Sequence, residues 1–128
     1  MENIEVSVIM DEENELPIPK VWRPILCQIV KSFSNKDYLV NSTILNVNSI
    51  TLDSSKHIKE YIESYGEELT ELPPKTWDSS IYLWMGSHWD VIVDLWTLDE
   101  GRSDLVLSAR VYKINNEYVF NVEMVHVP

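Results

Sequence analysis

The chain has little cysteine and little glycine. Its single cysteine, Cys27, excludes an internal disulfide and favours a reducing compartment, so we expect a cytoplasmic protein. Cys27 lies within an apolar helical stripe, which indicates a core residue rather than a nucleophile. Only three glycines are present, too few for the flexible loops that typically cradle a phosphate or a cofactor. We therefore predict no cofactor.

A long apolar run and a basic start are also missing. No stretch approaches the roughly 20 apolar residues that a membrane span needs. The first residues, MENIEVSVIMDEENELP, do not resemble a signal peptide. We expect neither a membrane partner nor secretion.

Basic residues are scarce. Ten lysines and arginines stand against 21 aspartates and glutamates, which gives a formal net charge of −11. A strongly acidic small domain does not bind nucleic acid by neutralising phosphates, so we predict no nucleic-acid partner. The charge suits a basic protein partner or the imitation of a polyanion, but acidity can also serve solubility alone.

The composition is typical of a folded globular protein. Apolar residues make up 45% of the chain, and its length fits one domain, residues 1–128, with a core of its own. Apolar residues spaced three and four apart predict helices at about 21–34 and 54–65. We expect Asp53 or Ser54 to cap the second helix, and Gly66 to end it.

Alternating apolar residues predict strands in the second half of the chain. The expected strands are 79–85, 89–97, 104–113 and 117–127. Short connections, among them a turn at Asn115 and Asn116 with positive φ, join them into an antiparallel meander. The predicted fold is α+β, a four-stranded meander at about 79–127 with both helices packed on one face.

Two earlier stretches are less defined. Residues 3–10 alternate and could add an N-terminal strand, and the acidic stretch DEENELP after them is expected to be a loop. Residues 38–52 are ambiguous and allow one irregular strand.

Strand periodicity separates two faces of the sheet. The odd positions of 89–95 and 105–111 are all apolar and predict the core face. Other residues expected to extend the core are Ile81, Leu83, Met85, Tyr118, Phe120, Val122 and Met124. The second face is expected to carry Tyr82, Trp84, Asp90, Ile92, Asp94, Trp96, Asp104, Val106, Ser108, Arg110 and Tyr112.

The second face allows two interpretations. Arg110 should lie opposite or diagonal to Asp90 and Asp94. If the face is bare, its aromatic residues rimmed by acids form a typical protein-binding surface. If the second helix or the N-terminal strand covers it, Trp84 and Trp96 belong to the core.

The stretch DEGRSD, residues 99–104, also has two interpretations. As a plain turn, it uses Gly101 for a positive φ and the side chains of Asp99 and Ser103 for local hydrogen bonds. As a binding loop, it projects Glu100, Arg102 and Asp104 from a hairpin tip toward a partner.

No pattern of catalysis or metal binding is present. None of the three histidines, His57, His88 and His126, belongs to a recognised nucleophile motif. The acids near His88 match no calcium loop or zinc spacing. We therefore predict no catalytic residues and no metal, and expect that the chain is not an enzyme.

The run from WRPIL through LPPKTW to VDLWTLDEGRSDLVL resembles a family of small uncharacterised bacterial domains, over most of the chain. As a small, acidic, cysteine-poor α+β domain, the chain is also similar to the immunity proteins of bacterial toxin systems, including contact-dependent inhibition. Those proteins share no sequence motif, so no residue role carries over. The resemblance implies a cytoplasmic inhibitor that binds a cognate toxin.

We predict an immunity-type binding protein, a monomer or weak dimer, that neutralises a basic toxin domain, with a nuclease as the first choice. Its acids would steer association and its aromatic residues would anchor the complex. The predicted contact residues are Trp84, Asp90, Asp94, Trp96, Glu100, Arg102, Asp104 and Arg110.

Two alternatives remain from the sequence. One is a small-molecule or metal-dependent enzyme with a pocket in the curved sheet, lined by Asp90, Asp94 and Arg110. The other is a polyanion mimic that inhibits a nucleic-acid-binding protein.

Overall fold

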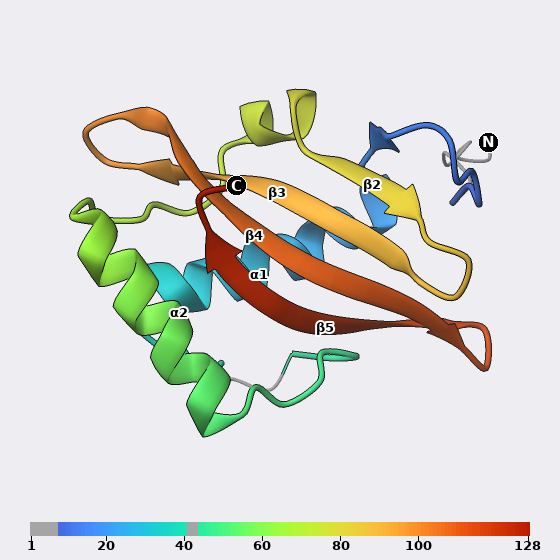
Figure 1. The fold of residues 1–128 in the computed structure, drawn as a ribbon, viewed down its shortest axis with the longest axis horizontal. Coiled ribbons are helices and arrows are strands. Elements are labelled where there is room, and N and C mark those ends of the chain that lie inside the picture. The colour runs from blue at the N-terminus through green and yellow to red at the C-terminus, as the bar shows by residue number, and fades with distance from the viewer. Residues whose placement is uncertain (1–7, 41–43) are drawn as a thin grey trace, which may run out of the picture.

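In the computed structural model, which describes residues 8–40 and 44–128, five strands form one antiparallel sheet (Figure 1). Each strand lies beside its neighbours in sequence, so the predicted meander is confirmed. The strands are β1 (Leu16–Pro17), β2 (Ile81–Trp84), β3 (Trp89–Thr97), β4 (Gly101–Ile114) and β5 (Glu117–His126).

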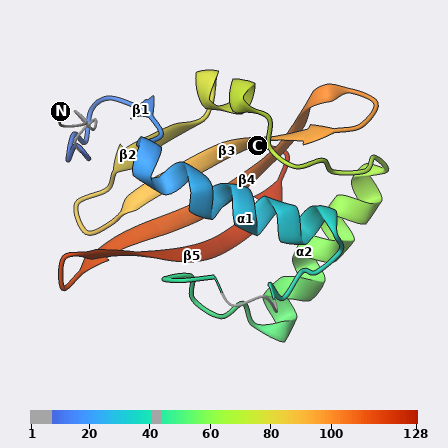
Figure 2. The ribbon, with the colours of Figure 1, turned by 180° about the vertical axis from the view of Figure 1, so that it is seen from behind.

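Two α-helices, α1 (Arg23–Ser34) and α2 (Leu52–Tyr65), accompany the sheet, so the predicted α+β class is confirmed. α1 runs across one face of the sheet, in front of it in Figure 2. α2 lies along the β5 edge and contacts β5. The expectation that both helices pack on one face is therefore met by α1. The second helix, α2, covers the side of the same core at β5.

Two short 3₁₀-helices, η1 (Lys20–Trp22) and η2 (Pro74–Asp78), precede α1 and β2. Pro24 lies in the first turn of α1, where its missing N–H costs nothing. The N-cap of α2 is Thr51, whose side chain accepts a hydrogen bond from the Ser54 amide at 3.1 Å, so the predicted cap was wrong by two or three residues. Gly66 ends α2 with φ of 87°, as predicted.

The additional N-terminal strand is β1, within the stretch that the sequence predicted to be a loop. Leu16 pairs with Tyr82 and Pro17 with Ile81. Proline cannot donate to a strand ladder, which keeps β1 short and at the sheet edge. Of the strand predicted at 3–10, residues 3–7 lie outside the described residues, and residues 8–10 form no strand.

The opposite edge of the sheet, along β5, is covered by part of the ambiguous stretch 38–52. Val47 forms a single parallel bridge to Phe120. The Phe120 amide donates to the Asn46 carbonyl at 2.8 Å, and the Asn48 amide donates to the Phe120 carbonyl at 2.9 Å. This stretch satisfies part of the β5 backbone without forming a regular strand.

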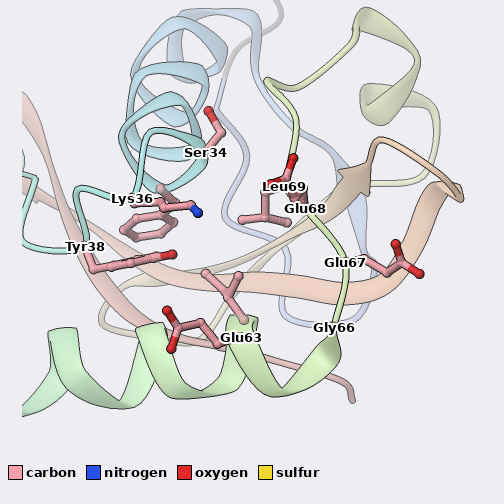
Figure 3. A pocket seen from close by; sticks show the side chains of 10 residues that line it. Ser34, Lys36, Tyr38, Glu63, Gly66, Glu67, Glu68 and Leu69 are labelled. Atoms are coloured by element: carbon pink, nitrogen blue, oxygen red, sulfur yellow. The ribbon is translucent and has the colours of Figure 1, made fainter.

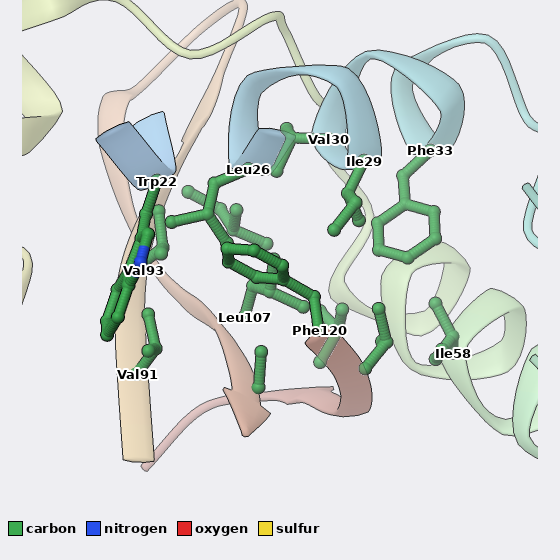
Figure 4. Close-up of a cluster of buried hydrophobic side chains, with 14 of the residues drawn as sticks. Trp22, Leu26, Ile29, Val30, Phe33, Ile58, Val91, Val93, Leu107 and Phe120 are labelled. Atoms are coloured by element: carbon green, nitrogen blue, oxygen red, sulfur yellow. The ribbon is translucent and has the colours of Figure 1, made fainter. Parts of the chain in front are cut away.

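The core lies between α1 and the sheet (Figure 4). Its central residue is Trp22, which is 1% exposed and meets four aromatic rings edge-on. Ring centroids lie 5.3 to 6.0 Å from that of Trp22. The four rings belong to Tyr82, Trp89, Tyr118 and Phe120. Burial of these rings supplies a large apolar contribution to stability.

The faces of β3 and β4 are as predicted, but that of β2 is reversed. Tyr82 pairs with Val91 and is 1% exposed, so it faces the core. Ile81 and Leu83 pair with residues of the second face and are half-buried, and Met85 is exposed. All four residues of β2 are apolar, so the sequence offers no alternation of apolar and polar residues from which the core face of β2 could be predicted.

The face of β5 changes at a bulge. Phe120 and Val122 face the core as predicted. The register shifts between Ser108 and Ala109 of β4, which places Val125 in the core and leaves Met124 48% exposed. The prediction for Met124 was therefore wrong, because an extra residue inverts the alternation beyond it.

Candidate functional site

The second face of the sheet bears no helix within the described part of the chain (Figure 1). It nevertheless does not carry the expected aromatic patch. Trp84 lies on the core side, where its ring centroid is 4.7 Å from that of Trp89. Trp96 is half-buried, and its ring packs beside the backbone of Gly101. The two tryptophans therefore do not form one surface.

The charges in the middle of this face are paired. Arg110 Nε lies 3.8 Å from Asp90 Oδ1 and 3.8 Å from Glu123 Oε1. Arg110 is the direct cross-strand neighbour of Asp90, as predicted, whereas Asp94 is opposite Val106. The sequence did not identify Glu123, which sits at the bulge of β5. The single cation offsets one of these two acidic charges, which leaves less net negative charge here than an unpaired group of acids would have.

Asp94 has a structural role at the β3 edge. Its amide donates to Ser80 Oγ at 3.0 Å, and its carbonyl accepts from Thr76 Oγ1 at 2.7 Å. Its carboxylate accepts a hydrogen bond from the Ser79 hydroxyl. These contacts hold η2 and the two serines after it against the part of β3 that β2 does not reach. Asp94 is therefore engaged within the fold.

The β2–β3 turn contains a chain of hydrogen-bonded side chains. Ser87 Oγ lies 2.9 Å from His88 Nδ1, and His88 Nε2 lies 3.1 Å from Asp90 Oδ1. The Asp90 carboxylate is shared with Arg110, which already balances its charge. Ser87 is exposed in the turn. This arrangement orders the turn and gives no specific support to the enzyme alternative.

A different region gathers negative charge, where the β3–β4 loop meets the end of α2. Tyr65 of α2 joins the two: its hydroxyl donates to Glu100 Oε1 at 2.8 Å and accepts from the Asp104 amide at 3.1 Å. The Leu98 amide donates to the Glu68 carbonyl at 3.0 Å. Five acidic residues meet here, and we call them the acidic end: Glu67, Glu68, Asp99, Glu100 and Asp104.

In the part of the chain that the structure describes, no lysine or arginine forms an ion pair with the acidic end. Partial loss of water and the nearby charges of Asp99 and Glu100 raise the pKa of Glu67. Arg102 is exposed in the same hairpin but forms no ion pair among the described residues. Gly101 has the expected positive φ, 76°, but the turn is shorter than predicted: residues 98–100 form it, and β4 already begins at Gly101. The region thus combines close carboxylates with solvent exposure.

A pocket of about 270 Å³ lies beside the acidic end, between the C-terminal ends of α1 and α2 (Figure 3). It shares Glu67 and Glu68 with the acidic end. Its lining residues are Phe33, Ser34, Lys36, Tyr38, Ile62, Glu63, Gly66, Glu67, Glu68 and Leu69.

The eight predicted contact residues therefore divide among five places, and Asp94, Trp84 and Trp96 each lie apart from the others. Glu100, Arg102 and Asp104 share the β3–β4 hairpin at the acidic end, and Asp90 and Arg110 pair on the second face. Glu67, Glu68 and Asp99 were missed as site residues. The sequence did show two adjacent acids, Glu67 and Glu68, directly after the helix-ending Gly66. Nothing in the sequence indicated that they lie beside the hairpin.

The described residues include no group of three or more histidine, cysteine, aspartate or glutamate side chains placed to hold a metal ion. Within the same part of the chain, neither helix has the length and apolar character needed to cross a membrane.

Comparison with known proteins gives one match. Residues 30–128 match a family described as a domain of unknown function (DUF7668). The matched region begins within α1 and includes all of α2 and β2–β5. No curated protein and no solved structure matches the chain.

Proposed function

The chain belongs to the DUF7668 family, a domain of unknown function, and we propose from its geometry that it binds a basic protein and neutralises it by direct contact. In this proposal it acts as an immunity protein does toward a toxin. A nuclease is the favoured class of toxin, because a nuclease presents basic groups to the phosphates of its substrate.

The observation that carries the proposal is the acidic end. Five carboxylates lie within one hairpin and one helix end, close enough for two of them to raise the pKa of Glu67. Like charges held together work against folding, and a basic surface placed over them would relieve that repulsion. Such a field also accelerates encounter with an oppositely charged partner.

The same region offers an apolar contact. Leu98, at the tip of the β3–β4 loop, is 66% exposed and stands directly before Asp99 and Glu100. An apolar residue surrounded by charges can be buried by a partner while the acids pair around it. Leu98 thus replaces the two tryptophans as the proposed anchor, with Glu100 and Asp104 retained from the sequence prediction.

Co-expression with the product of the neighbouring gene tests the proposal. We expect the protein to form a complex with that product and to protect cells from its toxicity. Absence of both the complex and the protection would falsify the proposal.

Charge variants locate the contact. The triple change Asp99→Asn, Glu100→Gln and Asp104→Asn should slow association about tenfold or more at low salt, and the loss should shrink as salt is added. The control removes three exposed acids elsewhere, by Glu13→Gln, Glu15→Gln and Glu117→Gln. Equal slowing by both triple variants would show that only overall charge matters and would remove the acidic end as the site.

A further inference from the structure

We propose that the pocket between α1 and α2 receives an arginine side chain of the basic partner. This inference rests on the proposed function, because it names the group that the partner would place beside the acidic end. A volume of about 270 Å³ lies just below the roughly 300–1,000 Å³ of pockets for drug-sized ligands. That size is suited to a single side chain.

The pocket has an apolar wall suited to the stem of a long side chain. The Phe33 and Tyr38 rings are stacked, with centroids 6.2 Å apart and planes 27° from parallel. Ile62 and Leu69 are buried and contribute to the lining. A flat guanidinium group stacks well on such aromatic faces, and its methylene groups can contact the aliphatic wall.

Tyr38 presents a polar group to the pocket. The residue is only 8% exposed, and its hydroxyl projects into the pocket (Figure 3). No described residue makes a hydrogen bond to this hydroxyl within the fold. This hydroxyl faces the open pocket, so it can exchange a hydrogen bond with a donor or acceptor that a partner supplies.

The acidic side chains that line the pocket favour a positively charged ligand. Burial, and after it the charge of Glu63, raises the pKa of Tyr38. Glu63, Glu67 and Glu68 line the pocket together with one cation, Lys36. A guanidinium carries five N–H donors in one plane, so it can bind a carboxylate and the Tyr38 oxygen at once, which an ammonium matches less well.

The first test uses small probes that differ in one property. N-acetyl-arginine amide is titrated into the full-length ¹⁵N-labelled protein and compared with N-acetyl-citrulline amide, which has the same shape without the charge. We expect saturable amide shifts at Ser34, Lys36 and Leu69 with the arginine probe, with a Kd on the order of 1–10 mM, and none with citrulline. Equal binding of citrulline, or shifts confined to other regions, overturns the proposal.

The second test uses variants of the pocket. Tyr38→Phe keeps the stacked ring and removes a hydroxyl that makes no hydrogen bond to any described residue, so it should weaken binding of the arginine probe about threefold with folding preserved. Glu63→Gln should weaken it by about threefold to tenfold, and Lys36→Gln should strengthen it. Glu60→Gln removes the same charge from α2 at an exposed position outside the pocket lining, and should leave binding unchanged. Equal loss in Glu60→Gln and Glu63→Gln contradicts the proposal.

The pocket proposal and the proposed function can be refuted independently. If the basic partner binds the Tyr38→Phe and Glu63→Gln proteins as tightly as the unchanged protein, while the acidic-end variant loses affinity, the pocket proposal is wrong and the function stands. If no basic partner is bound or neutralised but the arginine probe saturates the pocket, the proposed function is wrong and the cation site stands.

Discussion

Trp22 illustrates how one residue holds the elements of this fold together. It precedes α1, is 1% exposed, and contacts aromatic rings from β2, β3 and β5. Its indole Nε1 is buried without a hydrogen-bond partner, so its contribution comes from packing alone. The fold therefore depends on the volume of this side chain rather than on its polar atom.

This dependence gives a graded prediction for stability. Trp22→Ala should lower the free energy of unfolding by about 3–5 kcal/mol, as expected for a large cavity in a core. Trp22→Phe should cost less, because it keeps a ring and removes the unsatisfied N–H. Urea denaturation measures both, with Val21→Ala, at a 39% exposed neighbour, as the control. A loss below about 1 kcal/mol for Trp22→Ala would contradict the central place of this residue.

Glu67 gives a residue-scale prediction with a pH dependence. Its raised pKa means that the folded protein binds this proton more tightly than the unfolded chain does. Stability therefore rises as the pH falls from above the raised pKa, and the ionised carboxylate opposes folding at neutral pH. Glu67→Gln should raise the melting temperature at pH 7, and the gain should disappear toward pH 4.

Calorimetry across this pH range checks the sign. Glu60→Gln, which removes an exposed acid of α2 away from the acidic end, is the matched control. A gain that grows on acidification, or one that Glu60→Gln reproduces, would mean that Asp99 and Glu100 do not act on Glu67 in the way described.

At the scale of elements, the start of α2 depends on a single cap. Thr51 accepts the Ser54 amide at 3.1 Å, which satisfies one of the free N–H groups of the first turn. Thr51→Ala should cost about 1 kcal/mol in the free energy of unfolding, within a range of roughly 0.5–2. Thr51→Ser keeps the oxygen and should retain most of the stability in the same urea experiment. Similar losses for alanine and serine would exclude the cap as the cause.

The elements also show what the sequence can and cannot predict. In the middle of β3 and β4 one set of alternate positions is entirely apolar, so the core faces of both strands followed from the pattern. The bounds of β3 were also as predicted, whereas β4 begins three residues earlier and ends one residue later than expected. β2 is apolar at every position, and only its pairing of Tyr82 with Val91 determines its face. In β5, the bulge opposite Ser108 and Ala109 reverses the pattern near its end, and no local residue type marks it.

The acidic end was predicted only in its local part. Glu100, Arg102 and Asp104 share a hairpin that the sequence identified. Glu67 lies near them because Tyr65 joins α2 to the hairpin. Its two hydrogen bonds connect positions that are 35 and 39 residues apart in the sequence. The pocket was missed because Tyr38 lies in a stretch without periodicity.

At the scale of the whole molecule, the charges are unevenly distributed. The second face balances Arg110 between Asp90 and Glu123, whereas the acidic end has no internal cation partner among the described residues. The elements that form the acidic end, α2 and the β3–β4 hairpin, lie entirely within the region that matches the family, residues 30–128. We infer that this end of the molecule is where other members of the family should be compared for acidic residues.

The net charge of −11 also predicts how the whole molecule responds to salt. Raising KCl from 10 to 150 mM shortens the screening length from about 30 to 8 Å and weakens repulsion among the acids. The melting temperature at pH 7 should therefore rise, by roughly 2–5 °C for a domain of this size. The rise should be smaller in the acidic-end triple variant than in the triple variant at Glu13, Glu15 and Glu117, although both lose the same charge. A fall in melting temperature, or an identical rise in the two variants, would show that the acidic end is not where repulsion is concentrated.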